Sequence, residues 1–389
     1  MKPRFFHIII YIWGLLSFYA CSDNLELPEP DYKYENVAIV YWIGDNTLSS
    51  NAENDIAELV EGKDSIPDNS KIVIYVDKQN ALPKIYQLDA KDGLQVWKEF
   101  KKEEDCTDSL TMLTNLRDII KAFPAKNYGL TFGSHGTGWV VSRQHRALGP
   151  DETNNNSWIN VPTLRGILEH LPHMSYIFFD VCFMQSIEVA YELRNQTDWI
   201  IGSPAEIPGP GAPYHLITKA LCEGDPFEII DRYNEFYPKG IYSGTLLSVI
   251  ECSELENLAA CTSQYIKSYF ANRYILGSGV TQYIQRYSTI FSDSYTYYYD
   301  MNSAMHKILT EEDYSKWLEV FEMAVPIRKY NTGRWYSSFI CSYPFIYDGE
   351  HFGGVSMYIP QGGSEGDVKN DDLKQYQWYK DAGWNQTGW

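Results

Sequence analysis

Two side chains that could do chemistry stand directly after strand-like runs of the sequence. His135 follows the apolar run at residues 128–132 (YGLTF), and Cys182 follows the run at 176–179 (YIFF), about 50 residues further along the chain. A cysteine becomes a strong nucleophile when a nearby imidazolium or a helix N-terminus lowers its pKa. Ligands of parallel α/β sheets bind outside the carboxyl ends of the strands. We therefore expect the two residues to meet at one such edge as a thiol–imidazole pair for acyl transfer.

Glycines next to the histidine add a second element of this chemistry. Gly136 and Gly138 free the backbone beside His135, so an amide N–H can approach a substrate oxygen closely, as an oxyanion hole requires. Each feature alone also has a structural explanation, since a cysteine after an apolar strand is commonly an inert buried thiol and a histidine before a glycine is commonly a turn. The combination at this spacing is what indicates a catalytic site.

The elements that must position these residues follow an α/β pattern. Continuous apolar runs at residues 36–43 and 71–76 flank a helical pattern at 52–60, which predicts a βαβ unit of a parallel sheet buried on both faces. A hairpin is expected at 83–88 and 94–99. Further helices are expected at 110–123, 161–171 and 186–194, and further strands at 128–132, 176–179 and 199–201. The fold class is therefore an α/β sandwich with a mostly parallel sheet.

Composition divides the chain into four segments. Residues 1–21 are expected to be an export signal, 22–35 a tether, 36–221 the catalytic α/β domain, and 222–389 an α-rich C-terminal portion that packs against this domain and completes the fold. In the last segment, helices are expected at 255–269 and 313–323, and a strand at 354–359. The polar stretch at 141–157, which lies between His135 and Cys182, is expected to be an exposed, mobile loop.

The first residues have the pattern of a targeting segment. Lys2 and Arg4 precede an apolar run at residues 8–20 that is short for a transmembrane helix, which is typical of an export signal rather than of a buried core helix. Ala20 and Cys21 resemble a bacterial lipoprotein cleavage box, which predicts that Cys21 becomes lipidated. We expect an exported protein that is anchored to the bacterial cell envelope by this lipid, its only contact with a membrane, or is secreted.

Charge and cysteine usage exclude several classes of function. With 51 acidic against 32 basic residues and no basic stripe, the surface is expected to repel nucleic acid and to attract cationic partners or substrates. The seven cysteines lack the paired spacing of a zinc site and the density of a disulfide scaffold. The sequence requires no cofactor.

The central motifs resemble those of the clostripain family of cysteine endopeptidases, which are related by fold to the caspases, gingipains and legumains. The matching segments are NVAIVYWIGDNTLSSNAENDIAEL, YGLTFGSHGTGW around the histidine, DVCFMQSIEVAYELRNQTDWIIGSPAEIPGPGAPY around the cysteine, and GVSMYIP and YQWYKDAGW near the end. The resemblance implies a caspase-like α/β/α sandwich. Two departures, Val181 where alanine is commoner and residues 204–206 (PAE) in place of a more acidic run, affect the expected substrate preference and not the catalytic pair.

The resemblance also implies roles for individual residues. His135 and Cys182 match the catalytic pair, and the backbone N–H groups of Gly136 and Cys182 match the oxyanion hole. Asp180 matches the residue that recognises a basic side chain in the specificity pocket. The alternative role for Asp180 is structural, as an acid that orders the turn between strand and helix. Substrates would then be proteins or peptides with exposed Arg or Lys.

Maturation and metal use are further implications of the resemblance. Self-cleavage is expected between Arg146 and Ala147, with Arg143 as a second site, in the polar stretch between the catalytic residues. Clostripain is associated with calcium, so a calcium requirement stays open, although no loop of the EF-hand type is present.

Three functions are compatible with these residues. The first is a cysteine endopeptidase that cuts after Arg or Lys through an acyl-enzyme. The second is a catalytically silent surface protein of the same fold that binds proteins or glycans, and the third is a thiol hydrolase of small esters or amides. The intact pair of His135 and Cys182 favours an enzyme.

Overall fold

The strand β1 (Tyr34–Gly44) lies at the centre of the structure and is buried on both of its faces. In this computed structural model, alternate side chains from Val37 to Ile43 belong to one hydrophobic core, and those from Ala38 to Trp42 belong to a second core across the sheet. Two buried faces explain why the sequence of the strand is continuously apolar rather than alternating. The structure describes residues 31–139, 147–237, 245–277, 279–286, 294–330 and 349–389.

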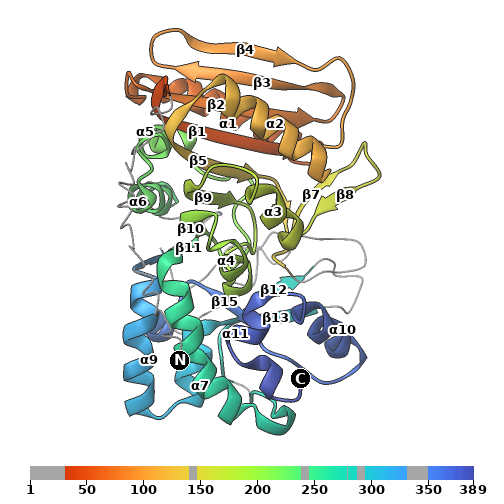
Figure 1. Cartoon of the computed structure of the whole chain (residues 1–389), viewed down its shortest axis with the longest axis vertical. Coiled ribbons are helices and arrows are strands. Elements are labelled where there is room, and N and C mark those ends of the chain that lie inside the picture. The colour runs from red at the N-terminus through yellow and green to blue at the C-terminus, as the bar shows by residue number, and fades with distance from the viewer. Residues whose placement is uncertain (1–30, 140–146, 238–244, 278, 287–293, 331–348) are drawn as a thin grey trace, which may run out of the picture. The chain divides into compact units, whose positions relative to one another are not determined.

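The central sheet contains nine strands among the described residues, in the order β14-β11-β10-β9-β5-β1-β2-β3-β4. Its members besides β1 are β2 (Ser70–Lys78), β3 (Ala81–Asp89), β4 (Gly93–Glu99), β5 (Ala125–Gly133), β9 (Met174–Asp180), β10 (Thr197–Gly202), β11 (Leu246–Glu251) and β14 (Ile327–Tyr330). The strands from β10 to β2 run parallel, and an antiparallel pair extends the sheet at each edge (Figure 1). The predicted parallel sheet and the hairpin at its edge are confirmed.

Helices cover both faces of this sheet. The core on one face contains α1 (Ser49–Glu61), α5 (Tyr214–Glu223) and α6 (Pro226–Phe236), and the core on the other contains α2 (Ser109–Ala122), α3 (Val161–Leu168) and α4 (Ile187–Leu193). The remaining helices are α7 (Leu255–Tyr269), α8 (Met301–Ile308), α9 (Glu311–Ala324), α10 (Ser364–Leu373) and α11 (Gln377–Asp381), with short 3₁₀ turns η1 (Lys63–Ser65), η2 (Cys252–Glu254), η3 (Ala271–Arg273), η4 (Gly349–His351) and η5 (Trp384–Gln386). The fold is therefore the expected α/β/α sandwich.

Two small sheets flank the carboxyl edge of the central sheet. One contains β6 (His135–Gly136), β7 (Leu148–Asp151) and β8 (Ser157–Ile159), and the other contains β12 (Gln282–Arg286), β13 (Ser294–Asp300) and β15 (Ser356–Tyr358). The prediction of an exposed, mobile loop at 141–157 is wrong for residues 147–151, because Leu148 and Asp151 are buried and β7 pairs with the strand that carries His135. The turn that follows, at residues 152–156, is largely exposed, as expected. Residues 140–146 lie outside the described residues.

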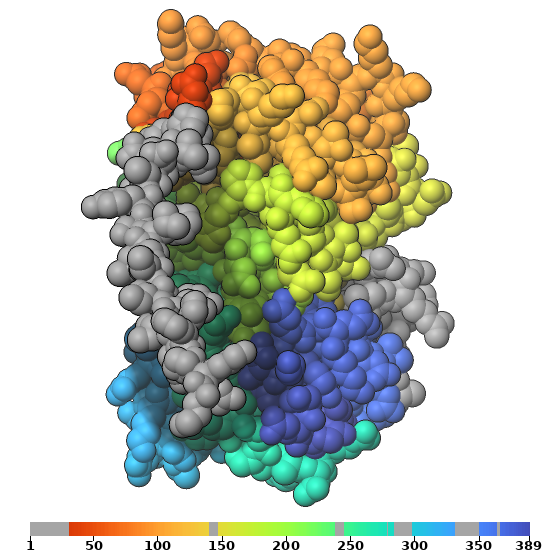
Figure 2. Space-filling view, in the orientation of Figure 1, coloured from red at the N-terminus to blue at the C-terminus, as the bar shows by residue number. Residues whose placement is uncertain are grey.

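The C-terminal portion shares the central sheet with the rest of the chain. Its strands β11 and β14 continue the sheet beyond β10, and the residues from Tyr32 to Trp389 form one compact unit. The expected segment boundary at residue 221 falls inside α5. The C-terminal residues, drawn in blue, lie against the yellow-green middle of the chain (Figure 2). Trp378 of α11 contacts Tyr191 of α4, with ring centroids 5.4 Å apart. Among the described residues, no helix is long and apolar enough to cross a membrane.

Candidate active site

His135 is placed by the end of β5 and by the small sheet beside it. Ser134 fixes the bend between the two, since its buried hydroxyl donates to the carbonyl oxygens of Ile43 at 3.1 Å and Gly149 at 3.2 Å. His135 then pairs with Gly149 in the β6–β7 ladder. The histidine backbone is therefore tied both to β1 and to β7, and its half-buried imidazole has little freedom to move away from the sheet edge.

The imidazole is oriented by Thr47, a residue that the sequence reasoning did not select. The hydroxyl oxygen of Thr47 lies 2.8 Å from Nε2 of His135. Thr47 belongs to the segment after β1, where the side chain of Asn46 donates to the carbonyl oxygens of Ile43 and Pro150, both at 2.9 Å. The rule that drew attention to the ends of β5 and β9 also applies to β1, and would have indicated this segment.

Cys182 stands in a tight turn between β9 and α4. The turn passes through Phe183, which adopts the left-handed region with φ of 61° although it is not a glycine. The strained turn is held by hydrogen bonds from the amides of Phe183 and Gln185 to the carbonyl oxygens of Ala205 and Ser203, each at 3.0 Å. Such a turn presents the half-buried thiol of Cys182 at the edge of the sheet.

The C-terminal portion buttresses this turn from the other side. Phe183 stacks on Tyr298 with ring centroids 5.8 Å apart, and the Tyr298 hydroxyl donates to the carbonyl oxygen of Thr137 at 2.5 Å. The amide of Ser356 in β15 donates to the carbonyl oxygen of Gln185 at 3.0 Å. One side chain, Tyr298, thus joins the segment after the histidine to the turn after the cysteine.

The histidine and cysteine segments are in direct backbone contact through Gly136. A Cβ built on Gly136 would lie 2.2 Å from Cγ1 of Val181 and 2.9 Å from the carbonyl oxygen of Cys182. These distances are too short for any side chain. The structure thus brings together His135, Gly136 and Cys182, as the strand ends led us to expect.

The resting thiol of Cys182 is in an environment that disfavours its ionised form. Burial and then the carboxylate of Glu206 raise the pKa of Cys182 to about 12, while the amide of Ile207, which donates to Sγ at 3.4 Å, acts in the opposite direction. Glu206 is itself buried. The sequence drew attention to Glu206 only as part of a departure from the family pattern. Formation of the thiolate in this setting requires a base that takes the proton directly.

Asp180 lies beneath the cysteine, buried and only partly satisfied. Its Oδ2 accepts hydrogen bonds from the amide of Ala212 at 3.0 Å and from the hydroxyl of Tyr214 at 3.1 Å. Its buried Oδ1 accepts none. Burial raises the pKa of Asp180 to about 6. Gly211, with φ of 71°, allows this approach, because a Cβ there would lie 2.6 Å from Oδ2.

Asp55, on α1, is another buried acid, and the charge of Asp180 affects its pKa. Burial, followed by the charges of Asp180 and Glu58, raises the pKa of Asp55 to about 10, so this carboxyl is neutral at neutral pH. The Asp55 side chain is buried and its Oδ2 accepts no hydrogen bond. Asp180 is therefore the acid of this pair that carries charge near neutral pH.

Some residues selected from the sequence lie away from this site, and others lie outside the described residues. Arg143, Arg146 and Cys21 lie outside the described residues. Ala147 is described, and it is buried next to Gly136, with its carbonyl oxygen 2.9 Å from the position of a Gly136 Cβ. The other described cysteines are free thiols away from the site, at positions 106, 222, 252 and 261.

Comparisons with known proteins identify relatives along most of the chain. A model of the clostripain family matches residues 40–389. A secreted C11 cysteine protease from Bacteroides thetaiotaomicron, solved in complex with an irreversible peptide inhibitor, is 30% identical, with a TM-score of 0.79 over 90% of this chain and 99% of that chain. An inactive zymogen C11 protease from Parabacteroides distasonis is 26% identical, with a TM-score of 0.76 over 90% of this chain and 98% of that chain. No curated protein sequence matches the chain.

The charge of Glu206 gives a direct test of the site's electrostatics. Because its carboxylate disfavours the Cys182 thiolate, Glu206→Gln is expected to raise the rate of Cys182 alkylation by iodoacetamide at pH 7 by roughly three- to tenfold. The measurement is the pH dependence of alkylation, which should shift to lower pH. Glu188→Gln is the matched control, since Glu188 is also a buried acid but does not act on the thiol. An identical pH profile in Glu206→Gln and wild type would show that no charge at Glu206 acts on the thiol.

Proposed function

Since this chain belongs to the clostripain family and is a cysteine peptidase, we propose that it cleaves peptide bonds after Arg, and more slowly after Lys, using Cys182 and His135. The observation that carries the proposal is the contact between the His135–Gly136 segment and the backbone of Cys182, which only a glycine at position 136 permits. Protein or peptide substrates follow from the family. The basic preference and the roles of the individual residues are the parts that we propose.

The proposed reaction uses the thiol and imidazole in two steps. His135 takes the proton of the Cys182 thiol, the sulfur attacks the carbonyl carbon of the substrate, and the departing amine receives that proton as the C–N bond breaks. Water then attacks the thioester, with His135 accepting one water proton, and the acid product leaves as the thiol is restored. The hydrogen bond between Thr47 and Nε2 supports this role, because it fixes the orientation of the imidazole ring.

The negative charge that develops on the substrate oxygen during the reaction requires hydrogen-bond donors next to that oxygen. We assign this role to the backbone N–H groups of Gly136 and Cys182. The close approach of these two segments supports the assignment, since it brings the main chain of both strand ends together. A buried site makes such donors stronger than they would be in water.

Preference for a basic side chain is assigned to Asp180. A buried carboxylate with one oxygen held by Ala212 and Tyr214 and the other without a donor is costly to leave charged and unpaired. A guanidinium supplies a charge and parallel N–H donors for such a group, whereas an ammonium makes a single point contact. Arg is therefore expected to be preferred over Lys.

Self-cleavage after Arg146 and lipidation of Cys21 complete the proposal. The burial of Ala147 beside Gly136 supports a link between cleavage and activity, because a cut after Arg146 would create a new chain end next to the histidine segment. Export is in line with the relative from Bacteroides thetaiotaomicron, which is a secreted protease.

The catalytic pair is tested by two single substitutions. Cys182→Ala and His135→Ala are each expected to reduce kcat/KM for an Arg peptide by at least about a thousandfold, because the two residues act as a unit. Thermal unfolding should change little, since neither side chain is fully buried. Activity above about a tenth of wild type in either variant would contradict the assignment.

Asp180 is tested by the ratio of kcat/KM for matched Arg and Gln substrates. Asp180→Asn keeps the shape of the side chain and removes its charge, so the ratio should fall roughly ten- to a hundredfold. In the wild type, the ratio should also fall as the pH drops through about 6, because Asp180 becomes protonated below its raised pKa and then cannot pair with the guanidinium. The ratio cancels the titration of the thiol and imidazole. A ratio that is unchanged in Asp180→Asn, or an equal loss for both substrates, would assign Asp180 to structure instead.

Intact-mass measurement of the full-length protein tests maturation and anchoring together. Wild type is expected to yield a fragment that begins at Ala147 and an N-terminal fragment that begins at a lipidated Cys21, whereas Cys182→Ala should retain the lipid but remain uncut. Identical cutting in both proteins would point to another protease. An unmodified Cys21 at the mature N-terminus would rule out the anchor.

A further inference from the structure

Asp180, the acid proposed to bind the basic side chain of the substrate, belongs to a row of residues that crosses three strands. Trp42 of β1 lies opposite Gly133 of β5, and Gly133 lies opposite Asp180 of β9. The Trp42 indole leans over Gly133, since a Cβ built on this glycine would lie 2.4 Å from Cε2 of the ring. The indole therefore fills the space beside Asp180, on the face of the sheet that α1, α5 and α6 cover.

The helix α1 brings a second acid to the level of this row. Ala52 contacts the end of β1, because a Cβ on Gly44 would lie 3.4 Å from the Cβ of Ala52. Since α1 returns the chain from the end of β1 to the start of the parallel strand β2, the helix runs back along β1. Asp55 lies one helical turn, about 4.5 Å, beyond Ala52. Trp42 lies two strand residues, about 6.6 Å, before Gly44, so Asp55 and Trp42 are at nearly the same level.

A loop after β10 connects α1 with Asp180. The side chain of Asn51, in the first turn of α1, donates to the carbonyl oxygen of Gly209 at 2.7 Å. Three residues further along this loop, the amide of Ala212 donates to Oδ2 of Asp180 at 3.0 Å. After burial, the charge of Asp180 is also the largest influence that raises the pKa of Asp55. The two acids therefore share one buried environment.

Tyr233 of α6 is a third polar side chain in this environment. The residue is 1% exposed, and its hydroxyl has no hydrogen-bond partner among the described residues. Burial and then the charge of Asp180 raise the pKa of Tyr233 well above its usual value, so the hydroxyl is neutral. Cys182 and Asp55 also contribute to this shift. The Tyr233 hydroxyl is therefore close enough to both acids and to the nucleophile to be affected by their charges.

Three buried oxygen atoms from three different elements thus have no hydrogen-bond partner in the described part of the chain. They are Oδ1 of Asp180 in β9, Oδ2 of Asp55 in α1 and the hydroxyl oxygen of Tyr233 in α6. Asp55 is neutral at neutral pH, but a neutral carboxyl group still has an oxygen that accepts a hydrogen bond. Buried polar groups are normally hydrogen-bonded. One charged and two neutral acceptors together suit a cation that carries several N–H groups.

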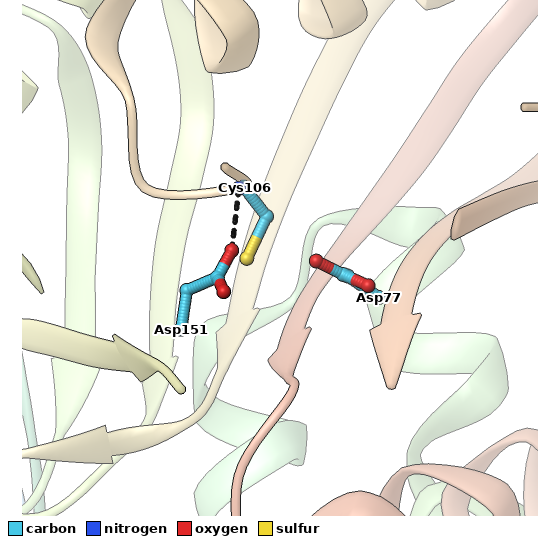
Figure 3. Close-up of side chains that lie close together, drawn as sticks. All are labelled: Asp77, Cys106 and Asp151. Carbon is cyan, nitrogen blue, oxygen red and sulfur yellow. Dashed lines mark hydrogen bonds between the residues drawn. The ribbon is translucent and has the colours of Figure 1, made fainter. Parts of the chain in front are cut away.

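Other buried acids at this edge lie on the opposite face of the sheet. Figure 3 shows the carboxylate of Asp77 facing that of Asp151, with the thiol of Cys106 beside them. The amide of Cys106 donates to Asp151 at 2.9 Å. Asp77 is two residues after Tyr75 in β2, so its side chain is on the same face as Tyr75, which belongs to the other core. The sheet separates this group from Asp55, which makes Asp77 a suitable control.

We propose that Asp55 and Tyr233 are further specificity-determining residues, which accept hydrogen bonds from the guanidinium of an Arg side chain bound at Asp180. The inference rests on the proposed cleavage after Arg. A guanidinium carries five N–H groups in a rigid plane, so it can reach acceptors on separate elements at the same time. An ammonium is a compact point charge that serves spread acceptors less well. Asp180 then selects a positive charge, and Asp55 and Tyr233 strengthen the preference for Arg over Lys.

The test compares kcat/KM of the full-length protein for matched peptides with Arg, Lys or Gln before the scissile bond. Tyr233→Phe removes only the hydroxyl and should lower the Arg-to-Lys ratio roughly three- to tenfold, as is typical for the loss of one hydrogen bond. Asp55→Ala should lower the ratio by a similar factor, whereas Asp55→Asn, which keeps a neutral carbonyl oxygen, should retain most of it. Asp77→Asn, the matched control, should leave the ratio unchanged. A purely structural role would reduce cleavage of all three peptides alike.

The outcomes separate this inference from the proposed function. A wild type without preference for Arg over Gln would contradict both. A preference that Asp180→Asn abolishes, with an Arg-to-Lys ratio unchanged in Tyr233→Phe and Asp55→Ala, would overturn the inference alone. Tyr233→Phe decides the outcome if Asp55→Ala does not fold, because the Tyr233 hydroxyl has no hydrogen bond to lose. If a variant cleaves too slowly, the dissociation constants of the Arg and Lys peptides, measured by calorimetry in the Cys182→Ala background, should show the same fall in preference.

Discussion

The approach of the His135–Gly136 segment to the Val181–Cys182 backbone is the contact on which the site depends. It is a consequence of the parallel pairing of β5 with β9, in which Gly133 lies opposite Asp180. Parallel neighbours end at the same edge, and so their next residues must pass close to each other. Only glycine fits at position 136, because a Cβ there would lie 2.2 Å from Cγ1 of Val181. The segments that carry His135 and Cys182 are neighbours because position 136 has no side chain.

The edge that carries this contact also carries most of the buried acids that the structure leaves partly unsatisfied. Asp180 and Asp55 lie on the side of α1 and α5, and Asp45 and Asp77 lie on the side of β7, close to Asp151. Ligands of such sheets bind outside the carboxyl ends of the strands, so this edge combines the proposed site with the least satisfied buried acids.

The C-terminal portion contributes rigidity rather than reactive groups to the described site. Gln185, in the turn after Cys182, is 0% exposed and donates to the carbonyl oxygen of Ser248 in β11 at 2.9 Å. Ser356 and Tyr298 reach the same turn from the small sheet. A turn with a non-glycine residue at positive φ persists only when its surroundings fix it, and these contacts come from residues far along the sequence.

The sequence by itself determined the sandwich, the order of its first strands and helices, and the two strand ends that carry His135 and Cys182. These follow from local periodicity and from the rule that parallel strands end together, and the family motifs pointed to the same residues. The sequence could not show that residues 148–151 form an ordered strand, because that depends on pairing with the histidine segment. It also could not reveal Thr47 beside His135 or the meeting of Asp45, Asp77 and Asp151, whose members are separated by up to 106 positions. Such contacts form only when strands far apart in the sequence lie next to one another, and the types of the side chains do not show which residues will meet.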